Sequence, residues 1–412
     1  MRLSHNMIYK NNLNSILNNQ QEVNKAQEQV TTQKRVLSAS DDPSAMARAL
    51  LYGDKIQTNE QYTKNLTMLK SRLDTQEGVL ENIKDSLTRA HVLTVQAGNG
   101  ALTKPDRAAL SEELSAIKTA VLDLMNAKSE DGRYIFSGYQ DNTKTFAYDS
   151  TNGRYAYNGD QGQHKIKVAE GVEIKSSDNG FDVFESVEQR LNVVSNTGLT
   201  VTGGISSASV YVKEQGPFDE FHKANFNPDP TAPVGSNTFT LDMTAGTPNA
   251  YTLRQGATVI ETGNFTDTKI LVAGMEFGID VAATGTVEFD LEAPKKDNVL
   301  NTIDDLVAAL IDDTLVDADY RQVLADSMIG IENAKNLVSQ TQSGLGGRLN
   351  TATRITEANN DLDINNKMSK AELIELDMAQ AITELTKHET ALQASQATFG
   401  RLSNLSLLDY IR

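Results

Sequence analysis

The feature that most constrains this chain is a sevenfold apolar repeat near its end. Within residues 370–412, one apolar row recurs every seven residues and a weaker row runs beside it. The first row is Met378, Leu385, Leu392 and Phe399, and the companion row is Ala381, His388, Ser395 and Leu402. So narrow a seam is typical of a coiled coil. Such a helix needs a partner, because most helical stability in proteins comes from packing.

The first forty residues offer that partner. Their apolar side chains also recur every seven positions, among many Asn and Gln residues. The row is Tyr9, Ile16, Val23, Val30 and Leu37. Neither terminal segment has enough apolar area to fold alone. We therefore expect the two chain ends to form long helices that pack against each other.

Residues 38–43 predict a joint between helices, because Ser and Asp are good N-caps and Pro43 suits a first helical turn. Beyond the joint, leucine recurs at sevens over thirty residues. Gly98-Asn99-Gly100 breaks this pattern and Pro105-Asp106 restarts it, which predicts an antiparallel helical hairpin. The recurring leucines are Leu66, Leu73, Leu80 and Leu87.

The period then changes from helical to alternating. The turn candidate Thr151-Asn152-Gly153 is flanked by aromatic runs, which predicts a β-hairpin laid on the helices. From residue 176 onward, short alternating runs separated by turn residues predict a compact β domain, either a sandwich or an open barrel. Its clearest runs are Ser209–Val212, Thr238–Leu241, Thr258–Ile260 and Thr286–Leu291.

Helical periodicity returns at Val299 and continues at sevens from Leu324 toward the terminal helix. Gly344, Gly346 and Gly347 interrupt that run and predict a bend. The fold class is therefore α+β: an elongated rod of long N- and C-terminal coiled-coil-like helices with an inserted antiparallel β domain. The expected segments are an N-terminal axial helix (1–42), a helical shaft with a β-hairpin (43–175), the inserted β domain (176–297), returning shaft helices (298–369) and a C-terminal axial helix (370–412).

Composition argues against several classes of partner. The net charge of −17 comes with no clustered basic stripe, which disfavours nucleic acid. No apolar run approaches the roughly 18 residues of a membrane-spanning helix, so we expect no membrane insertion. The first residues lack the apolar core and small-residue cleavage site of a secretory signal. Cysteine is absent, which removes disulfides and thiolate catalysis.

No motif for catalysis stands out. The five histidines are scattered and form no metal signature, and the glycines at 344–347 lack the Lys-Ser/Thr of a phosphate loop. The pairs Asp304-Asp305 and Asp312-Asp313 lack calcium-loop spacing, so a solvated helix face is the better interpretation. We expect no enzyme, and no catalytic, cofactor-binding or metal-binding residues.

Two segments carry a resemblance to a known family. Lys34–Pro43 and Leu349-Asn350 resemble the bacterial flagellin superfamily. Within it, Gly132–Gly138 and Leu405–Ile411 resemble hook–filament junction proteins more than filament flagellins. The resemblance covers roughly residues 1–175 and 298–412, and the β region matches only loosely.

The resemblance implies a structural protein of the extracellular bacterial flagellum, exported unfolded through the flagellar type III apparatus without a cleavable signal. It implies self-assembly as a short ring or helical layer between the first hook-associated protein and flagellin, with a flagellar export chaperone as a further partner and no cofactor. Two unsatisfied terminal seams are what a polymer core would require. The candidate polymer contacts are Tyr9, Ile16, Val23, Val30, Leu37, Met378, Leu385, Leu392, Phe399 and Leu402.

Two alternatives stay open. A filament flagellin would share the joint at residues 34–43 but not the ending at 405–411. A secreted coiled-coil adhesin would bind surface glycans through residues 176–297. The aromatic residues of that region are better explained as strand or core residues, which weakens the adhesin.

Overall fold

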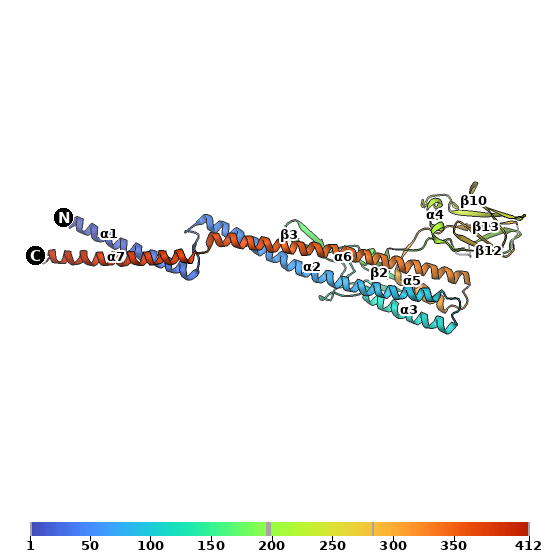
Figure 1. The fold of residues 1–412 in the computed structure, drawn as a ribbon, viewed down its shortest axis with the longest axis horizontal. Coiled ribbons are helices and arrows are strands. Elements are labelled where there is room, and N and C mark those ends of the chain that lie inside the picture. The colour runs from blue at the N-terminus through green and yellow to red at the C-terminus, as the bar shows by residue number, and fades with distance from the viewer. Residues whose placement is uncertain (1, 195–198, 282–283, 316, 411–412) are drawn as a thin grey trace. The chain divides into compact units, whose positions relative to one another are not determined.

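The computed structural model describes residues 2–194, 199–281, 284–315 and 317–410, with the side chains of 2–6, 317–318 and 402–410 outside the description. The chain divides into two compact units. We call Met1–Thr67, Lys167–Glu173 and Ala352–Arg412 the terminal unit, and Met68–Ile166 and Ile174–Thr351 the middle unit. Two long helices, α2 (Pro43–Ala97) and α6 (Asp317–Ile374), run through both (Figure 1).

The remaining helices follow the predicted order of helix, sheet, helix. The terminal unit adds α1 (Arg2–Thr32) and α7 (Met378–Tyr410). The middle unit adds α3 (Lys104–Met125), α4 (Gln215–Asn225), α5 (Val299–Ile311) and a π-helical turn, η1 (Phe181–Glu185). The predicted α+β class, with long terminal helices and an antiparallel β domain between them, is confirmed.

The sevenfold rows of α2 and α6 are the cores of these helices. Each predicted leucine of α2 is at most 1% exposed, and the row of α6 is equally buried except for Leu324 at 7%. That row is Leu324, Ile331, Val338, Leu345 and Ala352. Besides Thr94, the polar residue Gln76 lies fully buried on α2. Its amide donates to Asp178 at 2.9 Å, and Asp178 also pairs with Arg348 of α6.

The predicted β-hairpin is present. Strands β1 (Phe146–Asp149) and β2 (Arg154–Tyr157) pair antiparallel around the Asn-Gly turn. Asn126, the residue that follows α3, holds β1 through two bonds: its side chain accepts from the Phe146 amide at 2.9 Å and donates to the Phe146 carbonyl at 3.0 Å. A second hairpin is formed by β3 (Lys165–Ala169) and β4 (Val172–Lys175).

The β domain consists of two antiparallel sheets around one apolar core. The five-stranded sheet has the order β10-β9-β8-β13-β6 and the three-stranded sheet the order β11-β12-β7. Alternation builds the core: Phe239, Leu241 and Met243 of β8 point inward between half-exposed polar residues. The strands are β6 (Thr200–Gly203), β7 (Ala208–Val212), β8 (Thr238–Thr244), β9 (Asn249–Gln255), β10 (Thr258–Phe265), β11 (Lys269–Val272), β12 (Met275–Ile279) and β13 (Gly285–Asp290).

Two sequence expectations concern the continuity of the long helices. The three glycines at 344–347 do not interrupt α6, which is one helix of 58 residues. A Cβ at Gly344, Gly346 or Gly347 would meet no neighbouring atom within 4 Å, so they lie on an open face of the helix. Glycine weakens a helix by only about 1 kcal/mol each, and the packing of the long seam exceeds that cost.

The first helix ends at Thr32, well before the predicted joint, so Leu37 is not on it. Gln33 takes a left-handed conformation (φ 56°), and the chain then pairs with the segment between α6 and α7. Lys34 and Glu375 form an antiparallel bridge, flanked by bonds from the Arg35 amide to the Ile374 carbonyl at 2.9 Å and from the Leu376 amide to the Gln33 carbonyl at 3.1 Å. The end of α1 therefore lies beside the break between α6 and α7.

Asp41 organises the joint that follows. Its carboxylate accepts from the Ser38 amide at 3.0 Å and the Leu37 amide at 3.3 Å, and it pairs with Lys25 of α1 at 2.9 Å. Asp42 caps α2 by accepting from the Ala45 amide at 2.9 Å. The Lys25 ammonium, together with the Ser38 donors, lowers the pKa of Asp41 from 3.8 to about 2.

The joint should therefore loosen in acid. Because the folded pKa of Asp41 is depressed, its contribution is complete above pH 3.8 and is lost as the pH falls toward 2. In an NMR titration, the Ser38 amide shift should have its midpoint near 2. Lys25→Met should raise that midpoint and Asp41→Asn should flatten the curve. A midpoint at 3.8 in the parent protein would contradict the stabilisation of the Asp41 carboxylate by Lys25 and Ser38.

The β domain should be removable without unfolding the helices. Its core cluster contains no residue of α2, α3, α5 or α6. The segments that enter and leave the β domain are neighbours, because the Glu292 amide donates to the Asn192 carbonyl at 2.9 Å. Replacing residues 193–291 by Gly-Ser-Gly should preserve helical circular dichroism and a cooperative melt. A non-cooperative melt would mean that the β domain belongs to the helical core.

Candidate assembly interface at the chain ends

Helices α1 and α7 lie side by side and antiparallel in the terminal unit (Figure 1). The Tyr9 and Phe399 rings approach to 5.0 Å between centroids near one end of the pair. In the middle of the pair, the Asn19 amide donates to Ser395 Oγ at 2.7 Å. The predicted meeting of the two sevenfold rows is therefore present within one chain.

The candidate residues are unevenly covered in this pair. In α1, Val23 and the neighbouring Ala26 are buried, while Ile16 and Val30 are half-buried. In α7, Ala381 is buried and Leu385, Leu392 and Phe399 are half-buried. Tyr9 remains 51% exposed and Met378 37% exposed. Leu37 is half-buried in the joint, and Leu402 lies in the part of α7 whose side chains are outside the described structure.

A second set of apolar side chains in the terminal unit was missed by the sevenfold rows. These residues sit beside the rows rather than on them, and each is at least 40% exposed. They are Met7, Ile8, Leu13, Leu17 and Ile382 on the α1–α7 pair, and Leu50, Leu51, Leu362, Ile364 and Met368 on α2 and α6. Exposed large apolar side chains in this number are further candidates for contacts with another protein. Reading each helix for a second stripe could have found them.

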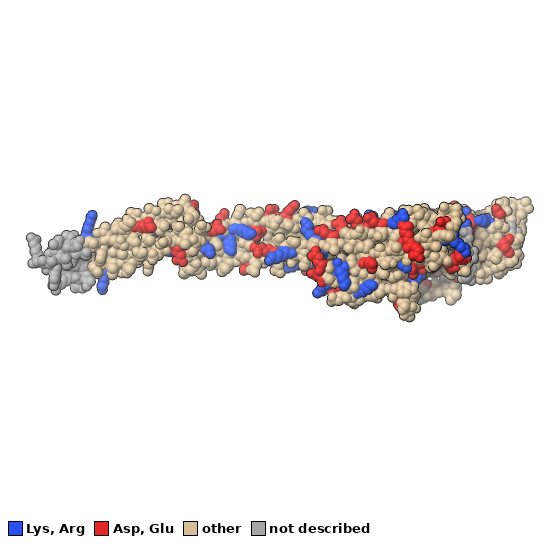
Figure 2. Space-filling model, turned by 90° about the horizontal axis from the view of Figure 1, so that it is seen from below, with Lys and Arg blue, Asp and Glu red and all other residues tan. Residues whose placement is uncertain are grey.

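Elsewhere the charged residues are mixed. On the face seen in Figure 2, Lys and Arg are interspersed with Asp and Glu rather than gathered into one stripe. Three acids of the pairs near α5, expected to form a solvated face, are ion-paired, and two of them, Asp305 and Asp313, have side chains that are 53% exposed. Arg154 binds Asp305 at 2.8 Å, Lys104 binds Asp313 at 2.7 Å, and Lys118 binds Asp304.

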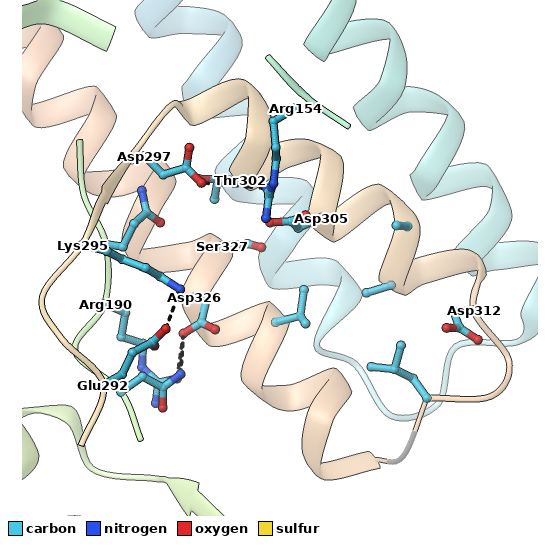
Figure 3. Close-up of a pocket in the computed structure, with 16 residues that line it drawn as sticks. Arg154, Arg190, Glu292, Lys295, Asp297, Thr302, Asp305, Asp312, Asp326 and Ser327 are labelled. Carbon is cyan, nitrogen blue, oxygen red and sulfur yellow. Dashed lines mark hydrogen bonds and ion pairs between the residues drawn. The ribbon is translucent and has the colours of Figure 1, made fainter. Parts of the chain in front are cut away.

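The middle unit contains a hollow of about 380 Å³ between α5, α6 and the segments that lead to the β domain (Figure 3). Its three basic residues are each paired with a carboxylate of the same wall: Arg154 with Asp305, Arg190 with Asp326, and Lys295 with Glu292. These three charges are used internally, so the basic residues of the hollow are not available to an anionic ligand.

No group of three or more His, Cys, Asp or Glu side chains in the described part of the chain is arranged to hold a metal ion. No helix among those residues is both long and apolar enough to cross a membrane.

Comparison with known proteins gives consistent relatives. The sequence profile of the bacterial flagellin N-terminal helical region matches residues 3–141. Flagellar hook-associated protein 3 of Escherichia coli (strain K12) is 25% identical over 407 residues, covering 99% of this chain and 98% of that protein. The flagellin of Bacillus subtilis (strain 168) is 30% identical over 148 residues, covering 35% of this chain and 49% of that protein.

A solved structure agrees at the level of the fold. The flagellar junction protein FlgL from Legionella pneumophila superposes with a TM-score of 0.57 at 23% identity, covering 80% of this chain and 100% of that one. The long paired helices, the N-terminal profile and the full-length similarity all agree with the resemblance to flagellin-like proteins found in the sequence. The chain is therefore similar to the bacterial flagellins in its N-terminal helical region, and to a flagellar hook-associated protein over its full length.

Proposed function

We propose that this chain is a structural protein of the bacterial flagellum that forms the junction between hook and filament and supports flagellin assembly. The observation that carries the proposal is the extent of the similarity. A relative named flagellar hook-associated protein 3 aligns over 99% of the chain, whereas the flagellins of Bacillus subtilis and Proteus mirabilis align over 35% and 74%. Filament flagellin is therefore the weaker candidate.

The terminal unit supports a role in self-assembly. The α1–α7 pair buries only part of its own seam, and the exposed apolar residues beside it would become buried against further copies. We propose assembly into a ring or helical layer that contacts the first hook-associated protein on one side and flagellin on the other. An export chaperone would bind the unassembled chain, and the assembled protein would be extracellular and non-enzymatic.

The glycan-binding adhesin lacks a comparable observation. The β-domain aromatics Phe218, Phe239, Phe277 and Phe289 are all at most 2% exposed, so they form the core rather than a sugar-stacking platform. A glycan array with the excised β domain would expose any residual activity of that kind.

Deletion of the gene tests the junction role. We expect intact hooks, absent filaments and flagellin shed into the medium, because flagellin would have no layer on which to assemble. Electron microscopy of the cells and an immunoblot of the medium are the readouts. Filaments of ordinary length in the deletion strain would refute the proposal, and absent filaments without shed flagellin would favour a filament subunit.

Leu392→Asp tests the terminal seam. Leu392 lies between Leu385 and Phe399 on the apolar row and is half-buried by its own chain. A carboxylate there would be desolvated in a polymer, at a cost of several kcal/mol against about 1 kcal/mol for an ordinary substitution. We expect motility and filaments to be lost, with the melt of the middle unit unchanged.

Gln393→Asp is the matched control, because it adds the same charge one residue away on an exposed position. It should retain filaments. Equal loss in both variants would show a general effect of charge. A lowered melt of the middle unit in Leu392→Asp alone would place the residue in the core of the monomer.

A further inference from the structure

Both covalent connections of the β domain run together as a two-stranded ribbon, which we call the neck (residues 187–194 and 290–297). Its lower part is the pair β5 (Val187–Glu188) and β14 (Lys296–Asp297). Above this pair, the Gln189 amide donates to the Lys295 carbonyl at 3.0 Å, and the Val194 amide donates to the Asp290 carbonyl at 2.9 Å. Because both chain connections of the β domain run through the neck, the orientation of the domain depends on the contacts between the neck and the helices.

The base of the neck is packed directly on α6. Asn333 of α6 donates to the Glu188 carbonyl at 2.7 Å. One turn away, a Cβ at Gly330 would stand 3.0 Å from Gln189 Oε1 and 2.9 Å from a Thr302 methyl, so the absence of a side chain lets the neck approach. Higher up, the hollow of about 380 Å³ separates the neck from the helices.

Arg190 spans this loosely packed region. Its side chain is 2% exposed, and each nitrogen of the guanidinium has a different partner. Nη1 donates to Asp326 of α6 at 3.1 Å, Nη2 donates to the Val212 carbonyl at the end of β7, and Nε donates to Gln215 at the start of α4. Figure 3 shows Arg190 reaching Asp326 beside the hollow. One side chain thus joins a helix of the shaft to two elements of the β domain.

The chemistry of this contact favours positioning over stability. Burial raises the pKa of Asp326 above its ordinary value even though Arg190 acts in the opposite direction. The desolvation of this carboxylate therefore outweighs the attraction of its partner. Arg190 is buried but 38% of the Asp326 side chain is exposed, so the pair adds little to stability, while its fixed geometry selects one arrangement over others. Lysine could not replace Arg190, because an ammonium lacks the planar fork of donors.

We propose that Arg190 and Asp326 form a latch that fixes the orientation of the β domain on α6. Without the latch, the β domain keeps its fold and stays attached through the base of the neck, but it swings over the hollow. The latch acts within a single chain, so it holds whether or not the proposed function does.

Spin-label distances measure this directly, because the chain contains no cysteine of its own. Labels at Thr262→Cys on β10 and Ser343→Cys on α6 report the placement of the β domain, since both positions are exposed. The parent should give one narrow distance distribution. R190K, and the double variant R190M/D326N that leaves no unpaired buried charge, should at least double its width, because domains on a flexible connection move by default.

Two controls keep the outcome clear. R254M removes another arginine that pairs with a carboxylate, Asp242, but inside the β domain, so its distribution should match that of the parent. The near-ultraviolet circular dichroism and the melt of the double variant should also match the parent. A narrow distribution in R190K or in the double variant would overturn the latch. Loss of the β-domain dichroism signal would overturn it too, because Arg190 would then be needed for the fold itself.

Discussion

The structure depends on apolar seams that recur every seven residues along helices too polar elsewhere to fold alone. In the middle unit the seam is closed: Leu80 of α2 and Ile331 of α6 are fully buried. In the terminal unit the seam is only partly closed, because α1 and α7 cover Val23 and Ala381 but leave Tyr9 half exposed. Since most helical stability comes from packing, the same sequence period yields a finished core in one unit and an unfinished surface in the other.

Local patterns in the sequence predicted part of the structure, and contacts between distant segments determined the rest. Periodicity predicted the residues of the helical core, and Asn152-Gly153 predicted the β1–β2 turn, because both signals are local. Leu37 continued the sevenfold row of the first helix on paper. It is not helical in the structure, because the left-handed Gln33 is stabilised by pairing with a segment more than 300 residues away. No local pattern encodes such a partner.

The same limit applies to charged residues. Asp305 is exposed, as expected for a solvated helix face, but no local pattern predicted its pairing with Arg154, which is 151 positions away in sequence. Arg190 carried no signal at all, since its acceptors are a backbone carbonyl, an amide and a carboxylate from three distant elements. The terminal rows were predicted with their partner helix. Their role as contacts between copies is a property of an assembly and remains a prediction, as do the segment boundaries assigned from the sequence.

Gln76 gives the leucine seam of α2 a unique register, which leucines alone cannot supply. A row of identical side chains at equal spacing would pack almost as well if one helix slid along the other by seven residues. After such a slip the amide of Gln76 would lose Asp178, and the carboxylate of Asp178, whose side chain is only 16% exposed, would lose one of its two partners. Leaving such buried polar groups unpaired costs free energy of about 1–3 kcal/mol each, or more for a charge. The Gln76 amide therefore restricts this repetitive interface to a single register. In the proposed assembly, where every copy would need the same dimensions, a single register would matter as much as stability.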